Sequence, residues 1–340
     1  MASSARSGRG HSSPTIYDVA RAAGVAPSTV SRAFSRPDRI NAETAERIRG
    51  IATELGYRTN PLARGLPTGR TSMIALASSD ITNPYYFEII RGAQAAAAER
   101  SYTTLLTDAQ ESIDLEREAL ERAVPTVEGI VLASTRMSDT AIRMLAKQRP
   151  LIAVNRDITG VPGVVTDHAM SVHQAVDHLT GLGHRHITYL SGPEAAWADS
   201  MRWRSLRIYA ADQDLHVRRL GPYPPTAAGG SAAATDFCSH RTSSVIAYND
   251  LLAVGFMRRL TSLGARLPAD VSVVGFDNIF VDDLVTPGLT TVAPPVRILG
   301  SMAVHNLLAL IGGAHTTTDR PISLPTRLFL RESTAAPGDN

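Results

Sequence analysis

The chain has 340 residues and a net charge of +2; 44% of its residues are hydrophobic, 19% are charged and one is cysteine. This length fits two or three domains, and the apolar fraction excludes a disordered chain. No stretch approaches the roughly 18 apolar residues of a membrane span, and the lone Cys238 excludes an internal disulfide or a cysteine-based zinc site, as expected of a cytoplasmic protein.

Charge is divided unevenly along the chain. Residues 1–70 contain eleven arginines and five acidic residues, whereas the rest contains 23 basic and 27 acidic residues. A basic head on an acidic body is typical of a polyanion-binding module joined to a soluble domain, although a solvated basic face gives the same count. Residues 1–14 lack the apolar stretch of a secretion signal, and we expect a flexible tail there.

Three short helices are predicted over residues 15–59. Thr15 and Asp18 have the spacing of a helix start, and Gly24 favours its end because glycine tolerates a left-handed turn. Pro27 suits the first turn of a second helix, over 27–34, since the N–H that proline lacks has no partner there.

A third helix is predicted to begin after Asn41 and to end at Gly56. Its apolar face comprises Ile48, Ile51 and Leu55. Two short helices joined by a glycine-containing turn and braced by a third are typical of a helix-turn-helix. A purely structural three-helix bundle is the alternative that the pattern alone leaves open.

In a helix-turn-helix, the second helix enters the major groove and its N-terminal side chains reach the bases. Pro27, Ser28 and Arg32 are the candidates for base contacts, and Arg32 could donate two hydrogen bonds to a guanine. Thr29 and Ser31 are better placed for phosphates, which position the protein without specifying sequence.

A linker is predicted over residues 60–70. Asn60 and Pro61 favour a helix start, but Gly65 and Pro67 limit that helix to about one turn. A segment this short is not stable alone in water, so a plain interdomain linker remains the alternative.

From residue 71 to 334, short apolar runs alternate with amphipathic segments. The predicted strands are 73–78, 103–107, 129–133, 151–155, 164–167, 187–191, 245–248 and 271–276. The predicted helices include 85–100, 115–123, 140–148, 170–182, 201–212 and 251–263. Such alternation predicts parallel sheets with helices on both faces, and the number of units predicts two Rossmann-like lobes, followed by a tail over 335–340.

Polar side chains gather where these strands end, which is where ligands bind in such folds. The loops with such polar residues are 78–86, 155–157, 167–168, 191–202, 249–250 and 277–278. Carboxylates, amides and an arginine beside aromatic rings are the groups that bind a sugar, because they bond its hydroxyls while a ring stacks on its C–H surface.

Residues 15–32, which read TIYDVARAAGVAPSTVSR, closely resemble the DNA-binding headpiece of the LacI/GalR family of repressors. One position departs: Ala26 stands where the family usually has serine, so the hydroxyl cap of the second helix is missing, a loss of about 1 kcal/mol. The resemblance implies DNA contacts in the headpiece by Thr15, Tyr17, Pro27, Ser28, Thr29, Ser31, Arg32 and Asn41.

The same resemblance gives the linker a role. In the family this segment forms a helix against its dimer mate on DNA, and a leucine opens the minor groove. The resemblance places Leu66 in that role, Ala63 where the two helices touch, and Asn60 at the start of this DNA-binding hinge. Pro67 disfavours helical backbone at the preceding residue, so we expect a shorter hinge helix than usual.

The body resembles the family's regulatory domain, which is similar to periplasmic sugar-binding proteins. The matching segments are GLGHRHI at 181–187, GP at 192–193, YND at 248–250 and VVGFD at 273–277. The residues predicted to bind an effector are Asn83, Tyr86, Arg156, Asp167, Trp197, Arg202, Asn249 and Asp277. For three of these residues a structural role remains the alternative to effector binding: Asn249 or Asp277 could cap a helix, and Trp197 could belong to the core. Pro225 and Thr226 stand where many members have an aromatic residue, so one wall of the site is expected to differ.

No motif for catalysis, a cofactor or a metal site is recognisable in the sequence. The resemblance implies a cytoplasmic homodimer that binds a palindromic operator in double-stranded DNA and responds to a small, sugar-like effector. Whether the effector releases DNA or promotes binding stays open. A sugar-binding transport component would leave the first 60 residues unexplained, and a doubly wound enzyme would need a glycine fingerprint where residues 78–80 read SSD.

Overall fold

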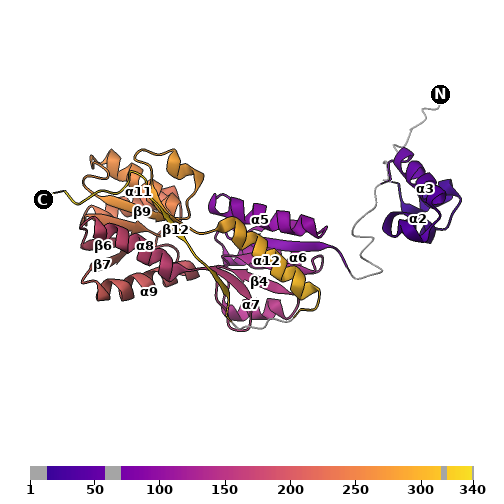
Figure 1. The fold of residues 1–340 in the computed structure, drawn as a ribbon, viewed down its shortest axis with the longest axis horizontal. Helices are drawn as coiled ribbons and strands as arrows, with labels where there is room; N and C mark the ends of the chain where they lie inside the picture. Colours follow the sequence, from indigo (N-terminus) through magenta and orange to yellow (C-terminus); the bar gives the residue numbers. More distant parts are fainter. Residues whose placement is uncertain (1–13, 58–69, 315–319, 339–340) are drawn as a thin grey trace, which may run out of the picture. The chain divides into compact units, whose positions relative to one another are not determined.

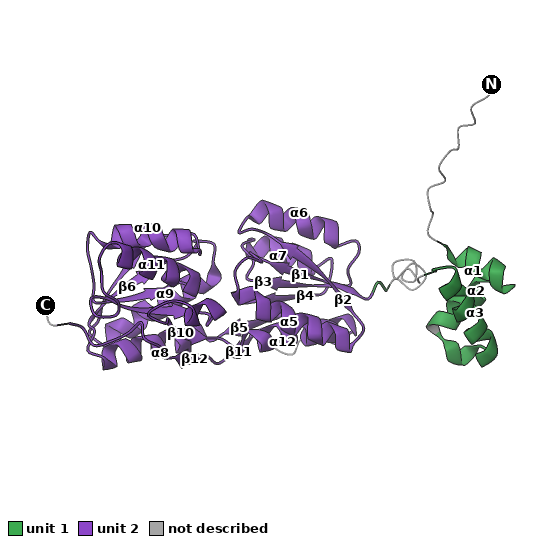
Figure 2. Cartoon of the chain, turned by 90° about the horizontal axis from the view of Figure 1, so that it is seen from above, with its two compact units in different colours: residues 1–71 green, residues 72–340 purple. Residues whose placement is uncertain are grey.

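The computed structural model describes residues 14–57, 70–314 and 320–338, and the chain forms two compact units, residues 1–71 and 72–340 (Figure 2). The predicted hinge residues Asn60, Ala63 and Leu66 lie outside the described residues. None of the described helices is both long enough and apolar enough to cross a bilayer.

The first unit is helical. Its elements are α1 (Ile16–Ala23), α2 (Pro27–Ser35), the 3-10 turn η1 (Pro37–Arg39) and α3 (Ala42–Glu54). The buried residues that join the three helices are Val19, Ala20, Ala23, Val30, Ala33, Ala45, Ile48 and Ala52. The predicted face of the third helix is only partly buried, because α3 ends at Glu54 and leaves Leu55 40% exposed as its C-cap.

The ends of these helices follow from their local chemistry. The Asp18 carboxylate accepts hydrogen bonds from the Thr15 backbone N–H at 2.9 Å and the Thr15 hydroxyl at 2.7 Å, which satisfies a free donor at the start of α1. Gly24 ends α1 with a φ of +63°, a conformation that favours glycine. Ala26 precedes α2 without a side-chain cap, as the sequence predicts.

The second unit contains two α/β lobes, each built on one sheet (Figure 1). The sheet of the first lobe, called the N lobe here, is parallel and runs in the order β11-β5-β4-β3-β1-β2. Its strands are β1 (Met73–Ser78), β2 (Thr103–Asp108), β3 (Gly129–Ala133), β4 (Leu151–Val154), β5 (Gly163–Thr166) and β11 (Ile322–Leu324).

Helices cover both faces of this sheet because its strands alternate buried side chains between two cores. One core contains α5 (Tyr85–Glu99) and α12 (Val296–Ile311). The other contains α6 (Ile113–Ala123) and α7 (Asp139–Ala146). A sheet buried on both faces is the arrangement expected for parallel strands.

The second sheet, in what is called the C lobe here, runs in the order β12-β10-β9-β8-β6-β7. Its strands are β6 (His186–Leu190), β7 (His216–Leu220), β8 (Ser244–Ala247), β9 (Ser272–Phe276), β10 (Thr290–Ala293) and β12 (Arg327–Phe329), with β12 antiparallel to β10. One core contains α8 (His168–Gly181) and α9 (Trp197–Asp212), and the other contains α10 (Ala227–Phe237) and α11 (Asp250–Ser262). A 3-10 turn, η2 (Phe280–Asp283), follows β9.

The chain crosses between the lobes three times, after β5, after β10 and after β11. Two of these crossings are hydrogen-bonded to each other: the Asp167 N–H donates to the Leu324 carbonyl at 2.9 Å, and the Ser171 hydroxyl lies 3.2 Å from that of Thr326. Bonds between neighbouring crossing segments fix where the two lobes are joined.

Glycines let two helix pairs approach at backbone distance. A Cβ added at Gly92 of α5 would lie 2.0 Å from the Arg297 carbonyl oxygen at the start of α12. A Cβ at Gly255 of α11 would lie 2.0 Å from the Ala227 carbonyl oxygen of α10. No side chain larger than hydrogen fits at either point.

The predicted fold class, a helical headpiece followed by two Rossmann-like lobes, is confirmed. Each of the eight predicted strands has a counterpart within about a residue at each end. Besides the two 3-10 turns, the predictions did not include six of the described elements: β7, β10, β11, β12, α10 and α12.

Candidate functional site

The second helix of the headpiece presents a polar surface. Ser28, Ser31 and Arg32 are exposed on α2, while Pro27 and Thr29 are half-buried. The opposite side of the helix is held in the core by Val30 and Ala33. The predicted base-reading and phosphate-binding side chains therefore lie on one helix, three of them exposed and two half-buried.

The remaining headpiece predictions fall outside α2. Tyr17 is 66% exposed on α1. Thr15 caps α1 through its contacts with Asp18, and the Asn41 side chain accepts the Glu43 N–H at 2.9 Å to cap α3. Thr15 and Asn41 thus have a structural task that does not depend on DNA.

A cavity lies between the two lobes of the second unit. It is lined from both lobes by Asn83, Tyr85, Tyr86, Glu111, Ser134, Arg136, Asn155, Ala198, Arg202, Pro225, Tyr248, Asn249 and Asp277. Its volume is about 30 Å³, whereas ligand pockets commonly have about 300–1,000 Å³. A larger ligand therefore requires the side chains over the cavity, or the lobes themselves, to move.

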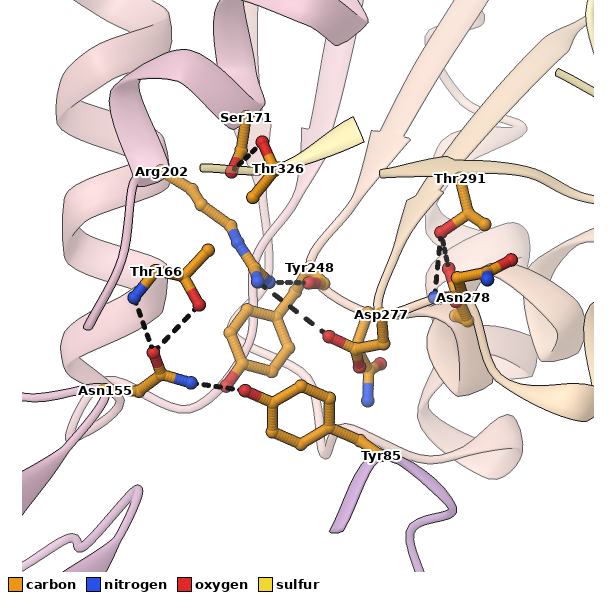
Figure 3. Close-up of polar contacts among 12 residues, drawn as sticks. Tyr85, Asn155, Thr166, Ser171, Arg202, Tyr248, Asp277, Asn278, Thr291 and Thr326 are labelled. Atoms are coloured by element: carbon orange, nitrogen blue, oxygen red, sulfur yellow. Dashed lines mark hydrogen bonds and ion pairs between the residues drawn. The ribbon is translucent and has the colours of Figure 1, made fainter. Parts of the chain in front are cut away.

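One part of the N-lobe wall is a chain of hydrogen bonds (Figure 3). The Asn155 amide nitrogen donates to the Tyr85 hydroxyl, and the Asn155 oxygen accepts from the Thr166 N–H at 2.9 Å and the Thr166 hydroxyl at 3.0 Å. Burial raises the pKa of Tyr85 and of Tyr86, so both phenols stay protonated at neutral pH. The wall therefore contains oriented neutral groups.

The other part of the N-lobe wall is an ion pair. Arg136, 6% exposed, donates from Nε to Glu111 at 2.7 Å and from Nη2 at 3.0 Å, and its Nη1 donates to the Ser134 carbonyl at 3.0 Å. Glu111 follows β2 and Arg136 follows β3, both at the carboxyl ends of their strands.

On the C-lobe wall, Arg202 of α9 lies over two aromatic rings. Its guanidinium carbon is 4.2 Å from the Phe276 ring centroid and 5.3 Å from that of Tyr248. Its Nη1 donates to the Tyr248 carbonyl, and its Nη2 lies 3.9 Å from the Asp277 carboxylate (Figure 3). The flat cation is held by stacking and charge together.

Asp277 directly follows β9 in a backbone conformation that favours glycine, with a φ of +122°. Burial raises its pKa well above the usual aspartate range, Arg202 acts in the opposite direction, and the nearby Asp250 adds to the rise. Observed strain at a buried carboxyl group is typical of a functional position.

Asp250 holds the loop after Asp277 in place. It is fully buried and accepts the Asn278 N–H at 2.6 Å and the Thr291 hydroxyl at 2.7 Å. Asp282, also fully buried, lies beside it. Burial first and the Asp250 charge second raise the pKa of Asp282.

Five of the eight predicted effector residues lie on the cavity: Asn83, Tyr86, Arg202, Asn249 and Asp277. Asn249 also caps a helix, the alternative considered for it, because its oxygen accepts the Leu252 N–H at 3.0 Å. Pro225, predicted to alter one wall, lies on the cavity and accepts from the Asn249 amide at 3.1 Å.

Three predicted residues are not among the lining residues. Arg156 points to Asp139, with 2.8 Å between Nη2 and the carboxylate. Asp167 caps α8 by accepting the Met170 N–H at 2.9 Å. Trp197 packs against the ring of His168, with 5.3 Å between centroids.

The sequence predictions omitted several lining residues, and two kinds of signal could have found them. Glu111 and Arg136 follow predicted strands whose loops were not considered. Tyr85 and Tyr248 adjoin two predicted residues that also line the cavity, Tyr86 and Asn249, whereas Asn155 lines it in place of the predicted Arg156.

Comparison with known proteins matches both units. Residues 15–60 match the family described as bacterial regulatory proteins, lacI family, and residues 176–334 match the periplasmic binding protein-like domain. The chain is similar to the HTH-type transcriptional regulator PtxS of Pseudomonas putida strain KT2440, with 30% identity over 94% of this chain and 96% of that protein.

Two solved structures extend the comparison. The lac repressor dimer bound to operator and the anti-inducer ONPF superimposes with a TM-score of 0.85 over 96% of this chain and 100% of that one, at 24% identity, which establishes similarity of fold. A LacI family transcriptional regulator from Enterococcus faecium with bound ribose gives a TM-score of 0.69 over 78% of this chain and 99% of that one, at 29% identity.

Proposed function

The chain belongs to the LacI family of bacterial regulatory proteins, and from this premise we propose that it is a repressor whose hold on its operator is set by a small sugar-like molecule bound between the lobes. The observation that carries the proposal is the polar cavity lined from both lobes, in a chain that also presents an exposed polar helix in its headpiece.

The DNA-binding part of the proposal rests on α2. Pro27, Ser28 and Arg32 reach bases in the major groove, and Thr29 and Ser31 contact phosphates. The exposure of Ser28, Ser31 and Arg32, with Val30 buried in the core, supports this assignment. DNA contacts by Tyr17, Thr15 and Asn41 belong to the same proposal. In the hinge, Leu66 enters the minor groove, Ala63 lies where the two hinge helices touch, and Asn60 lies at the start of the hinge.

The effector part rests on the cavity. Asn83 and Tyr86 from the N lobe, with Arg202, Asn249 and Asp277 from the C lobe, offer donors and acceptors to sugar hydroxyls, and the tyrosine ring offers a stacking surface. A similar regulator crystallised with ribose supports the sugar class. Arg156, Asp167 and Trp197 are left out of this set because they do not line the cavity.

The small volume of the cavity suggests how effector binding is linked to DNA binding. A space of about 30 Å³ does not hold a sugar ring, so binding must favour an arrangement of the lobes in which Arg202 or its neighbours have moved. The effector then changes DNA affinity by the ratio of its affinities for the two arrangements. A cytoplasmic homodimer on a palindromic operator, without catalytic activity, completes the proposed function.

Electrophoretic mobility shift at fixed salt tests this proposal. The full-length protein should bind the fragment upstream of its own coding region more tightly than a scrambled fragment of equal length, and at least one neutral sugar should change that preference. Equal binding to both fragments, with and without sugars, would contradict the proposed function.

An Arg32→Ala variant tests the assigned reading helix. We expect it to lose about 1–3 kcal/mol of preference for the operator over scrambled DNA, whereas its headpiece remains folded because Arg32 is exposed. Arg21→Ala, on exposed α1 surface, is the matched control for loss of one positive charge. Unchanged preference in the Arg32 variant would remove this residue from base reading.

A further inference from the structure

The charged groups on the cavity are arranged as pairs. Among its described lining residues, the charged ones are Glu111 and Arg136 from the N lobe and Arg202 and Asp277 from the C lobe. Each lobe therefore contributes one guanidinium and one carboxyl group, and neither guanidinium faces the cavity without a carboxyl beside it.

The Glu111–Arg136 pair has bidentate geometry. Both carboxylate oxygens are engaged, at 2.7 and 3.0 Å, by Nε and Nη2 of Arg136, and the remaining nitrogen, Nη1, donates to the Ser134 carbonyl. The Arg136 side chain is 5% exposed and that of Glu111 is 23% exposed, so the carboxylate is the more accessible partner. The edge of Arg136 that would hold an anion is occupied by Glu111.

Recognition of a phosphate or carboxylate group by arginine uses this same planar edge. A sugar phosphate or sugar acid would have to displace Glu111, and the displaced carboxylate would then repel it. A neutral sugar meets no such conflict, because its hydroxyls can donate to the outer lone pairs of Glu111 while Arg136 stays paired.

We propose that Glu111 determines the charge preference of the site, and that the effector is an uncharged sugar rather than its phosphorylated or carboxylated counterpart. This inference rests on the proposed function and narrows it to one class of ligand. Glu111 acts as a specificity residue by occupying Arg136, and its removal should turn the N-lobe wall into an anion site.

The test compares matched ligands on full-length protein by calorimetry: glucose, glucose 6-phosphate and gluconate, and ribose with ribose 5-phosphate. The wild type should bind a neutral member at least about tenfold more tightly than its anionic counterparts. Glu111→Gln, which keeps the shape and removes the charge, should reduce this preference at least about tenfold by gaining affinity for the anions.

Two variants control for side effects. Asp139→Asn breaks another N-lobe ion pair, that of Asp139 with Arg156 at 2.8 Å. This pair does not line the cavity, so the variant should leave the preference unchanged. Glu111→Gln leaves Arg136 as a buried cation without its carboxylate partner and could fold poorly for that reason. The double variant Glu111→Gln, Arg136→Gln removes the cation as well, and it should bind neutral sugar without gaining affinity for the anionic ligands.

The outcomes separate the two levels of the argument. A wild type that prefers a phosphorylated or carboxylated sugar, or a Glu111→Gln variant that gains no anion affinity, overturns the charge assignment and leaves the sugar-responsive regulator standing. A wild type that binds the operator but no sugar of either class overturns the proposed effector class, and this inference with it.

Discussion

Asn249 serves two purposes through the two atoms of one amide. Its oxygen caps α11 by accepting the Leu252 N–H at 3.0 Å, and its nitrogen donates to the Pro225 carbonyl at 3.1 Å on the cavity wall. Fold stability and the shape of the site therefore depend on the same side chain, although on different atoms of it.

Replacing Asn249 by serine or by alanine should separate these purposes. Serine retains an oxygen for the cap, so Asn249→Ser should unfold in urea close to the wild type, whereas Asn249→Ala should lose about 1 kcal/mol. Both lose the amide donor, so both should bind the effector more weakly by calorimetry. Equal stability of the two variants would show that the cap contributes little.

Asp277 gives the site a pH dependence of defined sign. Burial raises its pKa, so the carboxyl group becomes protonated at a higher pH than an ordinary aspartate. Sugar hydroxyls bond more strongly to the ionised form. Effector affinity should therefore rise with pH through the raised pKa and level off above it.

Calorimetric titrations across pH check this expectation. Asp277→Asn, whose acceptor does not titrate, should give a flat profile. His168 is another buried titratable group near Arg202, and burial lowers its pKa, so His168→Asn is the control that should keep the slope. If the slope disappears in the His168 variant instead, the proton belongs to the imidazole.

The cavity residues were predictable to the level of the loop, and less so to the level of the side chain. The rule that ligands bind at the carboxyl ends of strands located Tyr86 and Asn249, but for the loop after β4 it gave Arg156 in place of Asn155. Asn155 has a φ of +53°, and such a local backbone reversal decides which of two adjacent side chains faces the cavity. Sequence pattern does not encode that choice.

At the scale of elements, close helix pairs hold each lobe together. The α10–α11 pair meets at Gly230 and Gly255, where an added Cβ would lie 2.1 Å from the Leu252 carbonyl oxygen and 2.0 Å from the Ala227 carbonyl oxygen. The α5–α12 pair meets in the same way at Gly92 and Gly300. Backbone atoms are the obstacle at each point, and backbone yields less readily than a flexible side chain.

Gly255→Ala should destabilise the protein by about 2 kcal/mol or more, because the methyl group would force α10 and α11 apart. Gly181→Ala in α8 is the matched control: nothing lies within 4 Å of its added Cβ, so the change should be neutral or slightly stabilising. Urea unfolding of the full-length variants measures both. Equal stabilities would mean that the helices separate at little cost.

Most elements missing from the sequence predictions were hidden in the sequence for identifiable physical reasons, which differ from one element to the next. α10 contains the pair Gly229-Gly230, and two adjacent glycines predict a break in a helix. In the structure Gly230 instead allows α10 to approach α11 closely. β7 is an edge strand with the sequence HVRRL, whose charges obscure the apolar pattern. β11 and β12 have three residues each, too few to show any alternation, and exist because each completes a sheet made by distant residues.

At the scale of the whole molecule, the C-terminal segment bears on assembly. It is tied to its own C lobe: the Ser333 hydroxyl donates to the Val273 carbonyl at 2.6 Å, and the Ala335 carbonyl lies 2.9 Å from Nε2 of His184. Residues 331–340 also lack the apolar heptads of a coiled coil. This segment is therefore a poor candidate for joining two dimers.

Light scattering of the full-length protein should accordingly give about twice the chain mass of 36.3 kDa. A two-fold operator requires two reading helices, which sets the lower limit at the dimer. Deleting residues 336–340 should leave this mass unchanged. A tetramer that dissociates on this deletion would show that the terminal segment joins subunits after all.

The three crossings between the lobes also constrain how the protein is made. The sheet face that α12 covers with Leu299, Ala303 and Leu307 belongs to strands synthesised some 150 residues earlier or more, counted from β4 and β1. During translation α5 covers only part of this apolar face, and the part beneath α12 stays uncovered until the second lobe is nearly complete. Chains truncated before residue 296 should therefore bind chaperones far more than the full-length chain.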